Sequence, residues 1–154
     1  MVLRFNTSPD RNAILDGFLR FRAALHGAGV VTGFQWIDGS FLEDIETLEA
    51  RPPNDIDVVT FYYLPAGMTQ AMLLALNPNS APSRAKAAYR VEGYYQQLGA
   101  ASERLVRQSA YWYSVWSHRR SLAWKGYIEV ALDPANDAAA LALLASASAT
   151  GGAP

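Results

Sequence analysis

The chain has 154 residues, of which 51% are hydrophobic and 18% are charged, and its net charge is −1. This length predicts one domain with a real hydrophobic core and no large appended substrate domain. The near-neutral balance argues against a generally basic surface that coats nucleic acid. Cysteine is absent and His26 and His118 are the only histidines, which excludes disulfides, thiolate zinc sites and histidine-rich metal sites. Any metal would need oxygen ligands.

Localisation is predicted from what the sequence lacks. No run reaches the ~18 apolar residues of a membrane span. The first ten residues also lack the basic start and apolar middle of a secretory signal. We therefore expect a cytoplasmic protein with no membrane partner.

The first predicted element is a helix. Ser8-Pro9-Asp10 supplies an N-cap, a proline at the first helical position and a first-turn acid. Apolar residues then recur at helical spacing, at Ile14, Phe18, Phe21 and Leu25, and Gly27 and Gly29 are expected to end the helix. Residues 30–37 predict the first strand of the core.

A turn with the sequence Gly39-Ser40 follows this strand directly. In such a turn, backbone N–H groups and a hydroxyl can face an anion, and phosphate is the candidate. Residues 41–50 predict a short helix that starts at Ser40, whose dipole would favour that anion and whose acidic residues would form a solvated face. Asp38 has two interpretations, a metal ligand or a turn residue before glycine, and the second is favoured.

Paired acids open the next predicted strand. Pro53 precedes the strand because it cannot donate to a sheet ladder. Asp55 and Asp57 stand two apart in a β-branched and aromatic run, so the period of two puts both carboxylates on one face. At a separation of about 5 Å and an effective dielectric constant of about 20, the two carboxylates repel by roughly 3 kcal/mol. A hard divalent ion, Mg²⁺ or Mn²⁺, would remove that cost.

The remaining predicted elements follow in chain order. Residues 77–83, rich in Pro, Asn and Ser, are expected to be the most flexible internal segment. Residues 102–118 predict an aromatic helix, although 111–116 also fits a strand. The others are a helix at 68–76, a helical turn at 83–86, and strands at 89–98 and 124–132. The Ala-rich segment through Ala149 predicts at best a short helix, followed by a disordered tail at 150–154.

Gly39-Ser40 followed by Asp55-Ile56-Asp57 resembles the signature of the nucleotidyltransferase superfamily that shares the palm-like fold of DNA polymerase beta. The family pattern is a hydrophobic strand, Gly-Ser, a short helix, and Asp-x-Asp on the next strand. More narrowly, residues 37–41 with 53–57 resemble a group of small, largely uncharacterised bacterial proteins of this superfamily, over roughly residues 30–132. The interval between the two motifs is slightly longer here than is usual in the family.

This resemblance and the element pattern together predict an α+β fold. We expect a small mixed or antiparallel sheet that carries the site at one edge, with helices packed on one face, as in the palm-like nucleotidyltransferase fold. Residues 1–134 would form the single nucleotidyltransferase-like domain. Residues 135–154 would form the C-terminal helix and disordered tail.

The resemblance also implies an activity, the transfer of a nucleoside monophosphate from an NTP to a hydroxyl of protein or nucleic acid. Asp55 and Asp57 would hold two Mg²⁺ ions, and Gly39 and Ser40 would bind the outer phosphates. The family's third carboxylate falls where this chain has Glu92, although Asp is usual there. Glu92 as a ligand and Glu92 as an ordinary strand residue both stay open, with Glu129 as the reserve.

Basic and aromatic residues near the end of the chain have two interpretations each. Arg119, Arg120 and Lys125 could neutralise a triphosphate or pack on neighbouring rings. The aromatic residues beside them fit a core better than a platform for stacking bases. These residues are Tyr111, Trp112, Tyr113, Trp116 and Trp124.

The sequence lacks an evident acceptor-binding domain, so a partner protein is expected to supply recognition. By resemblance to small antitoxin-type members of the family, that partner would be a toxin or a defence component. The competing hypothesis is a non-catalytic protein that binds nucleotide or neutralises a toxin, and Glu92 in place of Asp is its best support.

Overall fold

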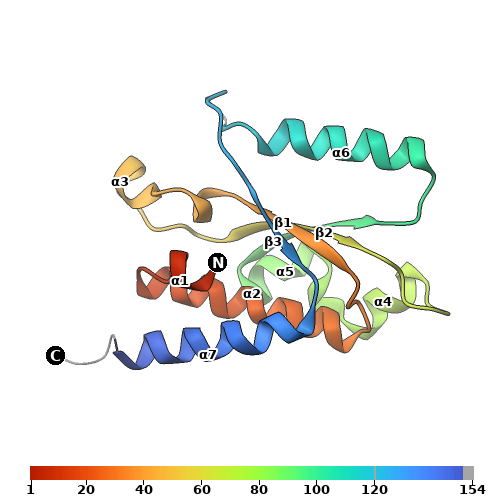
Figure 1. Ribbon diagram of the computed structural model, residues 1–154, viewed down its shortest axis with the longest axis horizontal. Coiled ribbons are helices and arrows are strands. Elements are labelled where there is room, and N and C mark those ends of the chain that lie inside the picture. Colours follow the sequence, from red (N-terminus) through yellow and green to blue (C-terminus); the bar gives the residue numbers. More distant parts are fainter. Residues whose placement is uncertain (120, 151–154) are drawn as a thin grey trace.

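The computed structural model describes residues 1–119 and 121–150, which contain a four-stranded mixed sheet and seven α-helices (Figure 1). The strand order is β3-β2-β1-β4. β1 pairs antiparallel with both β2 and β4, and β2 pairs parallel with β3. The predicted α+β class and mixed sheet are confirmed. The strands are β1 Gly33–Asp38, β2 Ile56–Tyr62, β3 Val91–Gln97 and β4 Ile128–Ala131.

The main core lies between one face of the sheet and α2, Pro9–Gly27. This helix begins as predicted, because the Ser8 side chain accepts a hydrogen bond from the Arg11 N–H at 3.3 Å. Its apolar face meets fully buried strand residues that alternate along β1 and β2. α1 (Val2–Phe5) and α5 (Pro82–Tyr89) pack beside α2 on this face (Figure 1).

A second, smaller core lies on the other face of the sheet, under α6 (Ser102–Trp116). Trp116 packs there against Val59 and Phe61, with Trp112 at its edge. The helical interpretation of 102–118 is confirmed. The expectation that helices cover a single face is wrong, because the aromatic side of α6 buries the second face of the sheet (Figure 1).

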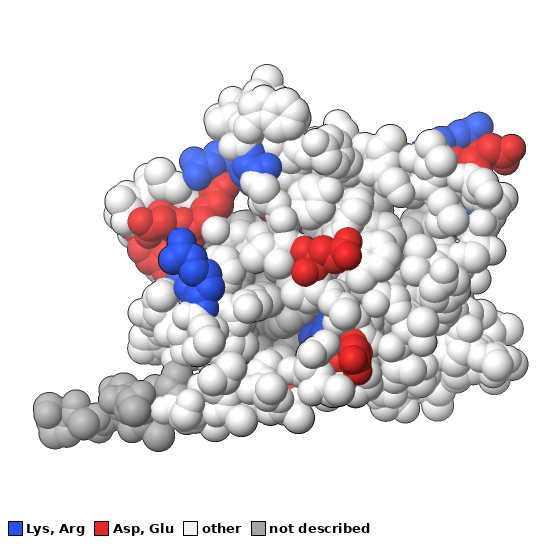
Figure 2. Space-filling model, viewed as in Figure 1, with Lys and Arg blue, Asp and Glu red and all other residues white. Residues whose placement is uncertain are grey.

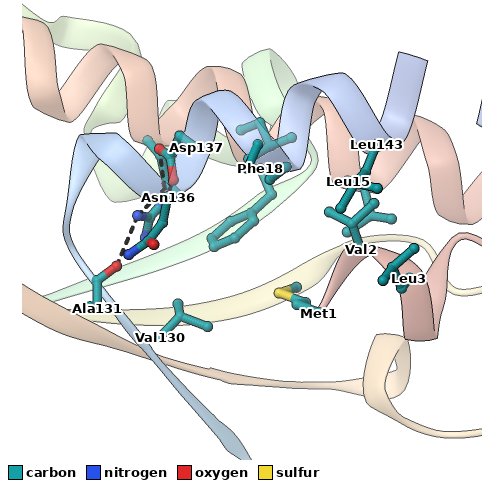
Figure 3. Close-up of a pocket in the computed structure, with 14 residues that line it drawn as sticks. Met1, Val2, Leu3, Leu15, Phe18, Val130, Ala131, Asn136, Asp137 and Leu143 are labelled. Carbon is teal, nitrogen blue, oxygen red and sulfur yellow. Dashed lines mark hydrogen bonds and ion pairs between the residues drawn. The ribbon is translucent and has the colours of Figure 1, made fainter. Parts of the chain in front are cut away.

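The Ala-rich segment forms a long helix, α7 (Pro134–Thr150), instead of a short one. α7 packs along α2 and contributes Leu144 to the main core. Arg22 of α2 forms an ion pair of 2.8 Å with Asp137 and donates to the Ala131 carbonyl at 2.9 Å. Figure 3 shows Asp137 and Ala131 among the residues that line the adjoining cavity. A cavity of about 350 Å³ lies between these elements and is lined mostly by apolar side chains. None of the described residues predicted for the site line it.

The predicted helix over residues 41–50 is wrong as a single element. The structure has a 3₁₀ turn, η1 (Ser40–Leu42), a break, and then α3 (Ile45–Glu49). The Arg11 guanidinium explains the break, because it takes the carbonyls of Phe41 and Glu43 at 2.7 and 2.6 Å. With only three residues in η1, a helix dipole at Ser40 no longer supports the anion site.

The other connections are short. α4 (Gln70–Leu76) begins at Thr69, and a 3₁₀ turn, η2 (Pro78–Ser80), occupies the segment expected to be most flexible. β4 covers only the second half of the predicted strand at 124–132, and Trp124 forms an isolated bridge with His118. In the part of the chain that the structure describes, no helix is both long and apolar enough to cross a membrane.

Candidate active site

Three acidic residues lie side by side across the sheet. Asp38 on β1 is directly opposite Asp57 on β2, and Asp57 is aligned with Glu92 on β3. Neighbouring strands are about 4.8 Å apart, so the three form one row. Residues two positions along each strand, Trp36, Val59 and Tyr94, belong to the core under α6. The strand alternation therefore places the acidic row on the α6 face.

A polar cavity of about 710 Å³ opens beside this row. Its volume lies within the range of about 300–1,000 Å³ that is typical of ligand sites. Besides the row, the lining includes the other predicted site residues that the structure describes, Gly39, Ser40, Asp55, Arg119 and Lys125. Arg120 lies outside the described residues. Figure 2 shows charged side chains of both signs gathered toward the α3 end of the molecule.

Two lysines bind the outer members of the acidic group. Lys86 Nζ lies 2.5 Å from Asp55 Oδ2 and 3.1 Å from Glu92 Oε2. Lys125 Nζ lies 2.7 Å from Asp38 Oδ2. The Tyr94 hydroxyl also donates to Glu92 Oε1 at 2.6 Å. No hydrogen bond or ion pair joins the Asp57 carboxylate to another residue of 1–119 or 121–150.

Burial and charge make the central acid hard to ionise. Burial, followed by the charges of Glu92, Asp55 and Asp38, raises the pKa of Asp57 to about 7. Burial also raises the pKa of Asp38, and the neighbouring Lys125 opposes that rise. Near neutral pH, Asp57 therefore holds a proton part of the time. A bound cation would compete directly with that proton.

Arg119 is held at the cavity by an ion pair with Glu43, 2.9 Å long. The backbone N–H of Arg119 donates to the Ala123 carbonyl at 2.8 Å, which closes the loop that carries it. The prediction that the acids of 41–50 form a solvated face is thus wrong for Glu43, which lines the cavity. Glu46 pairs with Arg11 at 2.7 Å, and its side chain stays 37% exposed to solvent.

The aromatic residues near Arg119 divide into two groups. Trp112 and Trp116 belong to the core under α6, as predicted. Tyr111 and Tyr113 are more than half exposed, and Trp124 is 73% exposed. Only part of this cluster therefore closes the interior.

Glu129, the reserve for the third carboxylate, lies away from the cavity. It is opposite Trp36 on the sheet and accepts a hydrogen bond from Trp36 Nε1 at 2.9 Å. Glu92 lines the cavity and continues the acidic row. Geometry therefore favours Glu92 over Glu129 as the third acid of the site.

The comparisons with known proteins bear on family alone. A model of DUF6932, described as a family of unknown function, matches residues 1–131. The chain belongs to the DUF6932 family. No curated protein and no solved structure matches it. The residues matched to DUF6932 include the whole acidic row and both lysines that bind it.

The sequence indicates one member of the site only weakly and another not at all. It favours a turn role for Asp38 over a metal ligand, because the strand register of Asp38 with Asp57 is a long-range property that the local sequence does not show. It places Lys86 only in a helical turn, since nothing local indicates that Lys86 faces Asp55. The weak signal for Lys86 is its position six residues before Glu92, at the end of a helix that turns back into β3.

The oxygen-rich chemistry of the row fits a hard divalent ion. Within residues 1–119 and 121–150, no three acidic or histidine side chains form a ready-made ligand set. Mg²⁺, however, commonly binds through one or two carboxylates plus water and substrate phosphates. Asp57 has no ion pair to a described residue, and its neighbour Asp38 is 3% exposed and binds Lys125, so Asp57 is the carboxylate of the row that is open to such a metal.

Proposed function

We propose that this chain is a small Mg²⁺-dependent nucleotidyltransferase. It would transfer a nucleoside monophosphate from an NTP to a hydroxyl of a protein or RNA and release pyrophosphate. One observation carries the proposal, the row of Asp38, Asp57 and Glu92 beside the Gly39-Ser40 turn. The order of strand, Gly-Ser turn, short helix and acidic strand agrees with the family pattern that the sequence resembles.

The residues around the cavity take distinct roles in this proposal. Asp55, Asp57 and Glu92 supply oxygen ligands for Mg²⁺ or Mn²⁺, and Asp38 lies beside Asp57 on β1. When bound, the metal orients the triphosphate and lowers the pKa of the attacking hydroxyl. Gly39 and Ser40 face the outer phosphates, and Lys125 and Arg119 add positive charge at the same cavity.

Acceptor recognition would come from a partner protein, which we propose to be a toxin or another defence component. The cavity itself carries both signs of charge, with Glu43 and Glu49 among its lining residues. Such a surface does not favour a nucleic-acid acceptor by charge alone. A protein partner that presents the acceptor hydroxyl fits this mixture of positive and negative charge better than a nucleic acid does.

One observation favours a second candidate, a non-catalytic protein that binds nucleotide or neutralises a toxin. Lys86 already binds Asp55 and Glu92, two of the acids that the active enzyme would use. In this candidate the cavity binds a nucleotide without a catalytic metal, and Lys86 and Lys125 neutralise the acids that would otherwise hold the metal.

Incubation with labelled NTPs tests both candidates. The purified protein is mixed with each NTP, with Mg²⁺ or Mn²⁺, and with cell extract, and label is sought on protein and RNA. We expect label transfer by wild type and none by Asp57→Asn. Glu129→Gln is the matched control, because it removes an acid outside the cavity. Nucleotide binding without transfer under every condition would support the second candidate instead.

A further inference from the structure

Another cavity, of about 310 Å³, lies at the opposite end of β2 from the acidic row. Asp57 is near the start of β2, whereas Tyr62, which lines this cavity, ends the strand. One wall comes from α4, and α4 and α3 lie at opposite ends of the molecule (Figure 1). Among the described residues, none lines both this cavity and the candidate active site. It is therefore a separate site, which the proposed function does not use.

The walls of this cavity are mostly apolar. Leu25 and Val30 of the main core form one side, and Leu73 and Leu74 of α4 form another. No residue of α4 is buried, although most of its side chains are apolar. Because short helices gain most of their stability by burying an apolar face, α4 would gain from an apolar molecule in the cavity.

Polar groups with hydrogens to donate also line the cavity. The Tyr62 hydroxyl accepts a hydrogen bond from Gln70 Nε2 at 3.4 Å, and its own hydrogen has no acceptor among the described residues. The Asn77 side chain likewise makes no hydrogen bond to a residue of 1–119 or 121–150. Tyr95, in contrast, donates to the Ser80 carbonyl at 2.5 Å, which holds η2 against β3. The cavity thus offers donors that the described chain leaves without acceptors.

Arg104 supplies the charge of this cavity. It lies in the first turn of α6, and no other charged side chain is found among the described lining residues. Within the part of the chain that the structure describes, its guanidinium forms no ion pair and donates no hydrogen bond. A guanidinium matches the geometry of a carboxylate, and no acid lines the cavity to compete for it. The charge therefore favours an anionic ligand.

We propose that this cavity binds a small monocarboxylate with an aliphatic chain. The chain of the ligand lies between Leu25 and Leu74, its carboxylate pairs with Arg104, and Tyr62 and Asn77 supply further donors. The cavity volume is at the low end of the range of about 300–1,000 Å³ that is typical of ligand sites, which suits a short or medium-length chain.

A series of straight-chain acids tests the class of ligand. Calorimetric titration of wild type with butyrate, hexanoate and octanoate should show the affinity rising about fourfold for each buried methylene. Octylammonium, which has the same chain and the opposite charge, should bind much more weakly than octanoate. Absence of octanoate binding, or equal affinity for octanoate and octylammonium, would overturn the proposal.

Variants of the walls test the position of the site. Leu74→Trp fills the cavity and should remove octanoate binding, whereas Leu76→Trp, at a 63% exposed position outside the lining, should keep it. Arg104→Met should weaken octanoate binding about two- to fivefold, the range of a solvent-exposed ion pair. Arg107→Met, an exposed change on the same helix outside the lining, is the matched control and should bind like wild type.

Hydrogen exchange measures the effect on α4 directly. Octanoate should slow exchange of the amides of residues 70–76 and leave those of α3, beside the candidate active site, unchanged. Unaltered exchange in α4 at saturating octanoate, or equal binding by wild type and Leu74→Trp, would place the acid elsewhere and overturn the proposal. The nucleotide-transfer assay is independent of these results, because no residue of the acidic row lines this cavity.

Discussion

Gly39 lies directly against the carboxylate of Asp57, so that a Cβ atom at position 39 would collide with Asp57 Oδ2. The φ angle of Gly39 is +90°, a conformation that glycine adopts readily and other residues rarely do. The turn that follows β1 therefore packs closely against the Asp57 carboxylate of β2, and only a residue without a side chain fits at position 39. The Gly-Ser and Asp-x-Asp motifs, separate in the sequence, form one unit in the structure.

Gly39→Ala should damage both the fold and the site. The added methyl group meets the Asp57 carboxylate and the backbone must keep an unfavourable φ, so we expect a loss of about 1–3 kcal/mol in the free energy of unfolding. Displacement of Asp57 should also weaken Mn²⁺ binding. Urea denaturation and calorimetry measure the two effects. Gly126→Ala is the control, because no atom lies within 4 Å of its added Cβ. Equal stability of the two variants would contradict the close contact.

Asp57 should make the stability of the metal-free protein fall as pH rises. Its pKa is about 7 in the folded protein against an ordinary value of 3.8, so the folded state binds the proton more tightly. The stabilisation from this protonation is complete below the unfolded pKa and is lost as pH rises through about 7. Asp57→Asn should lack this loss and be more stable at pH 8, by at most roughly 4 kcal/mol at about 1.4 kcal/mol per pKa unit.

Denaturation curves from about pH 4 to 8.5, with chelator present, measure the effect of Asp57, since this window brackets both pKa values. Glu129→Gln should keep the pH slope of wild type, because it removes an acid from outside the row. Parallel curves for wild type and Asp57→Asn would show that Asp57 titrates normally.

Local signals in the sequence predicted the elements that carry the site. The N-cap at Ser8 and the proline before Asp55 depend on neighbouring residues, and both mark the starts of elements correctly. Period-two alternation also placed Asp55 and Asp57 toward one side, and both line the same cavity. These properties are fixed by backbone chemistry within a few residues.

Long-range contacts decided what the sequence did not predict. The break in 41–50 depends on the guanidinium of Arg11, about thirty positions earlier in the chain, which takes two carbonyls from the expected helix. The length of α7 depends on packing against α2, which its Ala-rich composition does not indicate. Asp38 lies beside Asp57 because of the register in which β1 pairs with β2. No pattern in a single segment contains such information.

Ser40→Ala separates a phosphate-binding role from a structural one. Ser40 lines the cavity, and its hydroxyl makes no hydrogen bond to a residue in the described ranges. If it contacts a phosphate, its loss should weaken triphosphate binding by about 1.5–3 kcal/mol, as for a hydrogen bond to a charged group. The melting temperature should barely change. Ser121→Ala, at the same cavity, is the control. A lower melting temperature with unchanged affinity would make Ser40 structural only.

The last prediction concerns α7, which the sequence placed outside the main domain. Arg22 and Asp137 form a buried ion pair, with side chains 3% and 14% exposed. Asp137→Ala would leave the Arg22 guanidinium buried without its carboxylate, so we expect a loss of about 3–5 kcal/mol in the free energy of unfolding. Asp16→Ala breaks an exposed pair with Arg20, in which both side chains are 54% exposed, and should cost about 0–1 kcal/mol. Chemical denaturation of both variants measures the difference. Similar small losses would mean that α7 adds little to the stability of the sheet that carries the acidic row.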